Sequence, residues 1–328
     1  MPRGPGGECF HCFARAVVAV HRFWNNRRKM PIRDSIRALR LYYRSFGLFR
    51  KAFRDHWKAW LLPFGSGTFH PAHRKFKVRV PPHHWTMLPS VSRLVLEGFE
   101  PQWTDSGLAV RVGKHLLLSP PMDKSIAIGL REVFGDDVYG IQKEDLDGQV
   151  VLDIGAHIGD STVAFAARGA RVHAFEPVPV LQDFLRRNVQ ENGFDSSVAV
   201  HPVGLSNSDK MLEMWVNLTG SAGTTASETG RVDRERSGFV YQRLRLVDAV
   251  SYLRSQGILH ADVLKVDCEG CEYALFSEPS LLQLLRPRLV VMEFHDGCEG
   301  LRAFFARHGY RVESAGSARV GYLRGVRQ

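Results

Sequence analysis

Acidic residues and glycines alternate where a predicted buried strand gives way to a predicted helix. Residues 150–160 read Val-Val-Leu-Asp-Ile-Gly-Ala-His-Ile-Gly-Asp, with Asp153 at the end of the apolar run and glycines at positions 155 and 159. One glycine allows a tight turn that a ligand can approach closely, and the other allows the helix to pack against the strand. A strand, a glycine turn and a helix start, in this order, predict a nucleotide site.

The spacing of this turn argues against a dinucleotide. It reads Asp-x-Gly-x-x-x-Gly, whereas dinucleotide sites read Gly-x-Gly-x-x-Gly. Asp153 would repel a pyrophosphate but suits a ligand that carries an amine. Glu176 follows a second predicted strand and suits the two hydroxyls of a ribose. An amino-acid end and a ribose without phosphates describe S-adenosylmethionine, which we predict as the cofactor. The alternative is an ordinary strand–helix turn with two structural glycines.

A second group of acids follows a later predicted strand. Asp267, Glu269 and Glu272 come directly after the apolar run 263–266, around a turn that Gly270 permits. We expect Glu272 to open the next helix, where the helix dipole favours a carboxylate. Ligands of doubly wound sheets bind beyond the carboxyl ends of the strands. Asp153, Glu176, Asp267 and His295 all fall at such ends, so they are predicted to share one cleft.

The strand predicted at 289–294 carries Glu293 and is followed by His295. Polar groups in so apolar a strand need partners or a function. A histidine with a near-neutral pKa at a cleft could take the proton of a hydroxyl during methyl transfer. The structural alternative is a satisfied histidine at the rim of the sheet. A third possibility is that Asp267, Glu269, Glu293 and His295 hold Mg²⁺, although their spacing is not diagnostic and we predict no metal.

The cysteines do not suggest a disulfide framework. Their number is odd, which fits a reducing compartment. The first two could form half of a zinc site, but no second Cys/His pair follows at finger spacing. The five are Cys9, Cys12, Cys268, Cys271 and Cys298.

The net charge of +10 is concentrated at the N-terminus, because residues 1–60 hold 14 Lys/Arg and 3 Asp/Glu. Within residues 32–62, apolar and aromatic residues recur every three or four positions between Pro31 and Pro63, which predicts a basic amphipathic helix. It could dock on its own protein, contact an anionic membrane or acidic polymer, or grip nucleic acid. Apolar runs are too short for a signal peptide or a transmembrane segment, so we expect a cytoplasmic protein whose arm could reach a membrane surface.

From Val150 onward, predicted strands and helices alternate, which indicates an α/β fold with a doubly wound, Rossmann-like sheet. The predicted strands are Val150–Ile154, Arg171–Phe175, Val198–Gly204, Val263–Asp267 and Leu289–Phe294, with helices at Ser161–Arg168 and Val180–Asn192. Further extended segments are predicted at Met211–Val216, Tyr241–Leu246, Arg311–Ser314 and Val320–Leu323. A hairpin at 108–118 and a helix at 125–134 predict a small mixed cap. We therefore divide the chain into an arm at 1–63, a linker and cap at 64–131 and a catalytic domain at 132–328.

Several separate motifs resemble those of the FkbM family of S-adenosylmethionine-dependent methyltransferases. In order along residues 132–296 they are D-I-G-A-H-I-G-D from 153, A-F-E-P from 174, N-V-x-x-N from 188, V-G-L-S from 203, L-K-V-D-C-E-G-C-E from 264 and E-F-H from 293. Cys268 and Cys271 stand where that family shows small or apolar residues, so we interpret them as packing residues.

The resemblance implies a class I methyltransferase fold and O-methylation of a hydroxyl on a sugar, polysaccharide or natural product. The cofactor-binding residues it implies are Asp153, Gly155, His157, Gly159 and Glu176, and the catalytic residues are Asp267, Glu269 and His295. Acceptor choice would come from the polar loop 217–237 and the cap. Two rivals remain: an RNA methyltransferase that uses the basic arm, and a non-catalytic scaffold. Neither an Asn-Pro-Pro-Tyr motif nor a Pro-Cys dipeptide supports the first, and the acid pair Asp153/Glu176 argues against the second.

Overall fold

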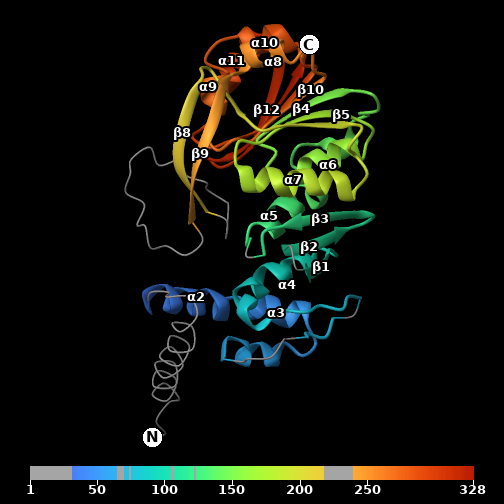
Figure 1. The fold of residues 1–328 in the computed structure, drawn as a ribbon, viewed down its shortest axis with the longest axis vertical. Coiled ribbons are helices and arrows are strands. Elements are labelled where there is room, and N and C mark those ends of the chain that lie inside the picture. The colour runs from blue at the N-terminus through green and yellow to red at the C-terminus, as the bar shows by residue number, and fades with distance from the viewer. Residues whose placement is uncertain (1–31, 65–69, 74, 105–106, 122, 218–238) are drawn as a thin grey trace, which may run out of the picture.

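The computed structural model describes residues 32–64, 70–73, 75–104, 107–121, 123–217 and 239–328. The molecule is elongated, with N-terminal helices at one end, a small sheet in the middle and a large sheet at the other end (Figure 1). The cysteines predicted as half of a zinc site and residues 218–237 of the polar loop lie outside the described residues.

The large sheet has seven strands in the order β12-β13-β11-β10-β4-β5-β6. Neighbouring strands from β11 through β10, β4 and β5 to β6 pair in parallel, while β13 is antiparallel to both β11 and β12. The predicted doubly wound, Rossmann-like fold class is thereby confirmed. The strands are β4 (Val150–Ile154), β5 (Arg171–Phe175), β6 (Val198–His201), β10 (Val263–Val266), β11 (Leu289–Phe294), β12 (Tyr310–Gly316) and β13 (Gly321–Arg327).

Helices cover both faces of this sheet (Figure 1). On one face, Val151 and Val263 pack with Phe165 of α6 (Asp160–Ala166) and Leu185 of α7 (Pro179–Glu191). The other face packs against α8 (Ala249–Ser255), α9 (Glu272–Leu275), α10 (Ser280–Leu285) and α11 (Glu299–Arg307). Because side chains alternate along a strand, the apolar runs fill two separate cores, one on each face.

The strand predicted at Val198–Gly204 is two strands in different sheets. β6 ends at His201, and β7 (Gly204–Ser206) pairs with β9 (Phe239–Asp248), which also pairs with β8 (Lys210–Asn217). Pro202 lies at the break, where its missing N–H cannot continue a ladder. The two extended segments predicted between residues 211 and 246 are confirmed as β8 and β9.

The predicted cap is a three-stranded antiparallel sheet of β1 (Glu100–Thr104), β2 (Gly107–Val112) and β3 (His115–Ser119). The hairpin around Gly113 is confirmed, and this glycine has φ +59°. Shorter helices precede and follow these strands along the chain: η2 (Pro82–Met87), α4 (Leu88–Leu96), α5 (Ile126–Leu130), η3 (Arg131–Gly135) and η4 (Ile141–Lys143).

Asn188 of α7 and Asn192, which follows the end of that helix, join the outer edge of β3 to the large domain. Asn188 accepts a hydrogen bond from Leu118 N (2.6 Å) and donates to the carbonyls of Leu118 (2.9 Å) and Ile158 (2.8 Å). One helical turn later, Asn192 accepts from Leu116 N (3.0 Å) and donates to Leu116 O (2.7 Å). The side-chain amides thus pair with β3 as a neighbouring strand would. They account for the Asn-x-x-x-Asn spacing seen in the sequence.

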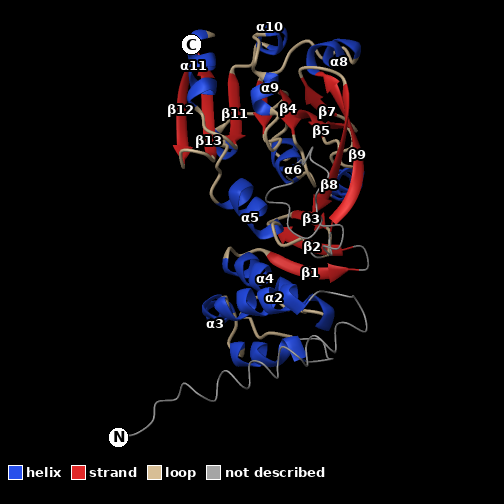
Figure 2. Ribbon diagram, turned by 90° about the vertical axis from the view of Figure 1, so that its left-hand side faces the viewer, coloured by secondary structure: helices blue, strands red, loops and turns tan. Residues whose placement is uncertain are grey.

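The single amphipathic helix predicted at 32–62 is wrong. The chain forms α2 (Ile32–Arg44), α3 (Phe46–Ala52) and η1 (His56–Phe64), with a break at Ser45 and extended backbone at Phe53. Leu39, Phe49 and Phe53 are buried in one core with residues of α4 and β2. Of the three interpretations of this stripe, its burial supports the docked one (Figure 2).

None of the helices in the described part of the chain combines the length and apolar character that a membrane crossing requires.

Candidate active site

The polar residues of three neighbouring strands lie on one face of the large sheet. Asp153 of β4, Lys265 of β10 and Glu293 of β11 each lie two residues after a valine that packs against α6 and α7. Because side chains alternate along a strand, the three polar residues share the face of these valines. All three approach the carboxyl ends of their parallel strands. These residues therefore meet at one end of the sheet, and a ligand cleft shared with the glycine turn stays a prediction.

A buried ion pair occupies the centre of this site. Lys265 Nζ lies 3.0 Å from Asp153 Oδ1 and 3.9 Å from Asp267 Oδ2, and it donates a hydrogen bond to Gly155 O (2.8 Å). Burial alone would lower the pKa of Lys265, but the charges of Asp153 and Asp267 outweigh burial and raise it. Lys265 therefore stays cationic and ties β4, the glycine turn and the end of β10 together.

Asp153 is enclosed by its partners, with no exposed surface. Besides the lysine, its Oδ2 accepts hydrogen bonds from Ser161 Oγ (2.8 Å) and Thr162 Oγ1 (2.6 Å) in α6. These contacts anchor the start of α6 to β4. Direct contact of Asp153 with the methionine end of a cofactor stays a prediction.

The two glycines of the turn are needed for different reasons, although not the two predicted, because each allows another segment of the protein to approach. Gly155 has φ +77°, and a Cβ there would overlap the carbonyl oxygen of Asp267. Gly159 has φ +91°, and a Cβ there would lie 2.5 Å from Leu185 Cδ1 on α7. The first glycine lets the ends of β4 and β10 approach, and the second lets α6 and α7 approach.

Glu176 lies at the end of β5 and is 4% exposed. Its Oε2 accepts from His157 N (2.9 Å) and its Oε1 from Val178 N (2.8 Å). Burial raises the pKa of Glu176 to about 7, and the two amide hydrogen bonds oppose that rise. His157 adopts φ +52°, a conformation that points its amide at this carboxyl group. A hydrogen bond thus joins the glycine turn directly to Glu176, the residue predicted to bind the ribose.

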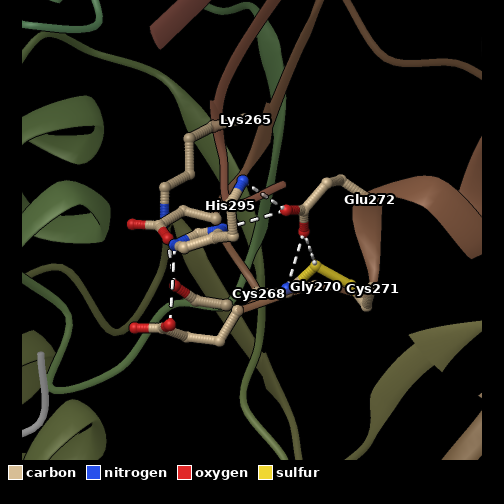
Figure 3. Close-up of a disulfide and its surroundings, with 9 residues drawn as sticks. Lys265, Cys268, Gly270, Cys271, Glu272 and His295 are labelled. Atoms are coloured by element: carbon tan, nitrogen blue, oxygen red, sulfur yellow. Dashed lines mark hydrogen bonds and ion pairs between the residues drawn. A yellow bond between two sulfur atoms is a disulfide. The ribbon is translucent and has the colours of Figure 1, made fainter. Parts of the chain in front are cut away.

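His295 is held by the buried Glu272. Its Nδ1 and backbone N lie 2.9 and 3.2 Å from Glu272 Oε1 (Figure 3). Its Nε2 lies 3.5 Å from Glu269 Oε2 and 3.9 Å from Glu293 Oε2. One ring nitrogen therefore faces the buried Glu272, and the other faces the carboxyl groups of Glu269 and Glu293.

The carboxylates change the protonation of this histidine. Burial would lower the pKa of His295, but the hydrogen bond and charge of Glu272, with the charges of Glu269 and Asp267, raise it to about 9. Burial, followed by the charge of Asp267, raises the pKa of Glu293 to about 8. The near-neutral histidine expected from the sequence is therefore wrong: at pH 7 this group of residues retains protons.

Asp267 accepts a hydrogen bond from the buried hydroxyl of Tyr139 (2.9 Å). Burial and the charge of Asp267 raise the pKa of Tyr139, so the hydroxyl keeps its proton and remains a donor. Asp267, Glu293 and His295 each offer a ligand atom within 4.8 Å of the others, a set from which Glu269 is missing. A divalent cation would find two oxygens and one nitrogen there.

Cys268 and Cys271 form a disulfide, with their Cα atoms 5.4 Å apart. Their interpretation as packing residues is therefore incomplete, although both also lie against the core on the α8–α11 face. The sequence predicted no disulfide framework, and this single bond forms without one, because a Cys-x-x-Cys turn brings its two ends within disulfide reach.

Lys265, Glu272 and Tyr139 were not predicted as site residues. A signal for Lys265 was present, because a charge within an apolar strand must be paired. Glu272 does open α9 as expected, but it is fully buried and its oxygens bind His295 and Gly270. Tyr139 lies 128 residues from Asp267 in sequence, and no local pattern marks it.

Comparison with known proteins identifies the domain. Residues 153–312 match the family model of the methyltransferase FkbM domain. The methyltransferase sdnD of Sordaria araneosa is 29% identical over 167 residues, which cover 43% of this chain and 64% of that protein. The AMB antimetabolite synthetase AmbE of Pseudomonas aeruginosa is 26% identical over 225 residues, 56% of this chain and 10% of that protein. The chain thus spans less than two thirds of either curated relative.

Among solved structures, the magnesium protoporphyrin IX methyltransferase of Synechocystis PCC 6803 with bound SAM is 14% identical, with a TM-score of 0.37. That alignment covers 62% of this chain and 83% of that chain. The strand order of the large sheet, with antiparallel β13 between β11 and β12, is that of the class I methyltransferase fold implied by the motifs. Residues 153–312 of this chain therefore match the methyltransferase FkbM domain, and the resemblance seen in the motifs is confirmed over that range.

Proposed function

We propose that the protein transfers a methyl group from S-adenosylmethionine to a hydroxyl of a sugar, polysaccharide or natural product. The observation that carries the proposal is the convergence, on one face of the sheet, of the Lys265–Asp153 pair, Glu176 and the acids around His295. The first relative is named a methyltransferase and the second an antimetabolite synthetase, and both names fit chemistry on small molecules.

The donor groups of the corner fit the cofactor. Glu176 is fixed by two backbone amides, which leaves oxygen lone pairs for the ribose hydroxyls. Lys265 neutralises Asp153, so the corner does not carry an uncompensated buried charge. When bound, S-adenosylmethionine supplies a methyl group already activated on a sulfonium, so the protein chiefly has to place the acceptor in line.

The acids around His295 would manage the proton that the hydroxyl loses. Glu272 fixes the ring of His295, so that its Nε2 lies toward Glu269. With both His295 and Glu293 protonated, no base is available from this pair. We infer that the pair can act as a base only after one of its two protons has dissociated. The rate of methyl transfer should therefore rise with pH through about 8.

Cofactor binding tests the proposal. S-adenosylmethionine should raise the melting temperature of the full chain and NAD should not. Glu176→Ala should weaken binding about 10- to 100-fold, because a buried hydrogen-bonding partner of the ribose is lost. The matched control is Glu191→Ala, an exposed residue on α7 that should bind as the wild type does. Isothermal titration gives both constants, and equal affinity of the Glu176 variant would contradict the ribose assignment.

The acceptor is tested with radiolabelled methyl groups. Counts transferred from labelled S-adenosylmethionine to hydroxyl-bearing sugars, polysaccharides and polyketides, and absent from RNA, would support the proposal. Transfer to RNA alone would replace it with the nucleic-acid alternative.

We also propose that the exposed basic residues of the arm contact an anionic surface, such as a membrane. The apolar side of α2 and α3 is used for docking, which leaves cationic side chains and Trp57, 60% exposed, facing solvent. The exposed cations are Arg40, Arg44, Arg50, Lys51, Arg54 and Lys58. Co-sedimentation with phosphatidylserine vesicles but not with phosphatidylcholine vesicles, lost in high salt, would support this contact. Equal behaviour with both would leave the basic face as a solvated surface.

A further inference from the structure

We propose that Cys268 and Cys271 form a thiol–disulfide exchange site that takes a dithiol reductant and sets how firmly Glu269 and Glu272 hold His295. The proposal does not depend on methyl transfer, because its measurements follow sulfur chemistry and backbone exchange.

The disulfide closes the turn that carries the acids. It spans just Glu269 and Gly270, which have φ +55° and +112°. A left-handed conformation is unfavourable for glutamate, so it persists only where the surrounding chain enforces it. In this turn Glu269 Oε2 lies 3.5 Å from His295 Nε2. The cross-link therefore holds a strained residue in the position where it meets the histidine.

Glu272 connects the disulfide to the histidine from the other side. Its Oε2 accepts from Gly270 N (2.9 Å) and lies 3.5 Å from Cys268 Sγ, while its Oε1 contacts His295 (Figure 3). Glu272 is fully buried, so solvent cannot compensate for any change among these partners. A change at the Cys268 sulfur is thus passed through one carboxyl group to the histidine.

The location of this disulfide suits thiol–disulfide exchange better than stabilisation of the fold. A disulfide stabilises a fold least when the loop that it closes is short, and this loop is as short as a Cys-x-x-Cys turn allows. Both sulfur-bearing residues are partly exposed, and the intervening Glu269 and Gly270 are exposed. A reductant can therefore reach the bond from the surface. Cys298, by contrast, is free and buried.

The chemistry balances with a dithiol as the reductant. One of its thiolates attacks a sulfur of the Cys268–Cys271 bond and forms a mixed disulfide, and its second thiol displaces the protein sulfur. The protein gains two electrons and two protons and becomes a pair of thiols, while the dithiol becomes a disulfide.

Reduction changes the contacts in one direction. The new Cys268 S–H can donate to Glu272 Oε2, in competition with Gly270 N. Without the cross-link, Glu269 can also relax to a negative φ and leave His295. Both changes weaken the contacts of Glu269 and Glu272 with His295. The carboxyl groups of Asp267, at the end of β10, and Glu293, on β11, remain near the histidine.

The test uses the full chain after oxidation with oxidised dithiothreitol or reduction with dithiothreitol. Alkylation and peptide mass analysis should find Cys268 and Cys271 blocked in the oxidised protein and both labelled after reduction. Amide hydrogen exchange at Gly270 and His295 should be about fivefold or more faster in the reduced protein, with Val151 of β4 unchanged.

Variants separate the site from a general effect of reductant. The Cys268→Ser/Cys271→Ser protein should exchange at the reduced rate in both conditions, whereas Cys298→Ser should keep the redox response. Three results would overturn the proposal: both thiols labelled after oxidation, identical exchange at His295 in the two states, or stoichiometric Zn²⁺ retained by the reduced protein, which would make the pair metal ligands with Glu272.

Discussion

A single buried carboxyl group sets the protonation state of His295 in the site. Glu272 has no exposed surface and binds both the backbone and the ring of His295. Because water cannot screen this contact, a full charge at Glu272 favours the imidazolium form strongly. A protonated His295 donates hydrogen bonds, and a deprotonated one accepts them, so Glu272 determines which role the histidine has at a given pH.

Glu272→Gln should lower the pKa of His295. The amide keeps the shape of the side chain but removes its charge, so the pKa should fall from about 9 by ~1–2 units. Titration of the imidazole signals by NMR measures the change. Glu269→Gln is the matched control, because Glu269 is exposed and its loss should shift the pKa less. Equal shifts in the two variants would contradict the dominant role of Glu272.

Glu293→Gln should change how stability depends on pH. The folded pKa of Glu293 is about 8 and its ordinary value is 4.5, so between these values the folded state holds a proton that the unfolded state has released. Stability is therefore lost as pH rises through this window, and glutamine removes that loss. The free energy of unfolding of the variant minus that of the wild type, measured with urea, should therefore be ~1–3 kcal/mol larger at pH 8.5 than at pH 5. Exposed Glu313→Gln should show no such difference.

At the scale of elements, the site is built where two parallel strands and one turn meet. β4 and β10 run side by side, with Asp153 opposite Lys265 in the register. The turn after β4 then passes beneath the carbonyl of Asp267, so close that a side chain would not fit at Gly155. The position of each acid thus depends on the approach of two backbones, and this approach can be tested with a single methyl group.

Gly155→Ala should destabilise the protein by more than ~3 kcal/mol, because the new Cβ meets backbone as well as an unfavourable φ. Gly193→Ala is the control, since Gly193 has φ +72° with nothing within 4 Å and should cost only ~1 kcal/mol. Chemical denaturation compares the two. Similar losses would mean that the backbone at Asp267 yields readily.

The sequence predicted the elements whose causes are local. β4, β5 and β11 have the predicted bounds, because strands buried on both faces are mostly apolar and stand out locally in the sequence. The break of the arm at Ser45 and the separation of β6 from β7 depend on what each half packs against, which a periodic pattern does not record. The candidate site shows the same difference between local and tertiary causes. The glycine turn and Glu176 were predicted from their spacing, whereas Tyr139 reaches Asp267 only through tertiary packing.

At the scale of the whole molecule, the arm and the catalytic domain share a core. Leu39 and Phe49 of the arm belong to the same buried cluster as Val110 of the cap and Ile158 and Val163 beside the glycine turn. An apolar core that continues through these parts predicts that they unfold together rather than as separate units.

Phe49→Ala should therefore lower the free energy of unfolding by ~3–5 kcal/mol and leave a single transition, because a large buried ring is lost from the shared core. Trp57→Ala removes an equally aromatic but 60% exposed side chain and should change stability by less than ~1 kcal/mol. Thermal unfolding followed by circular dichroism and by tryptophan fluorescence measures both. Two separate transitions in the phenylalanine variant would show that the arm unfolds by itself.

The asparagine pair at the end of α7 also has a consequence for self-association. An uncovered edge strand offers unpaired main-chain groups to any strand of another molecule, which is how sheets recruit further copies and aggregate. Asn188 and Asn192 already engage the N–H and C=O groups of Leu116 and Leu118. The small sheet is therefore closed to strand addition along that edge, and the two amides that join cap to domain also protect the protein from polymerising through it.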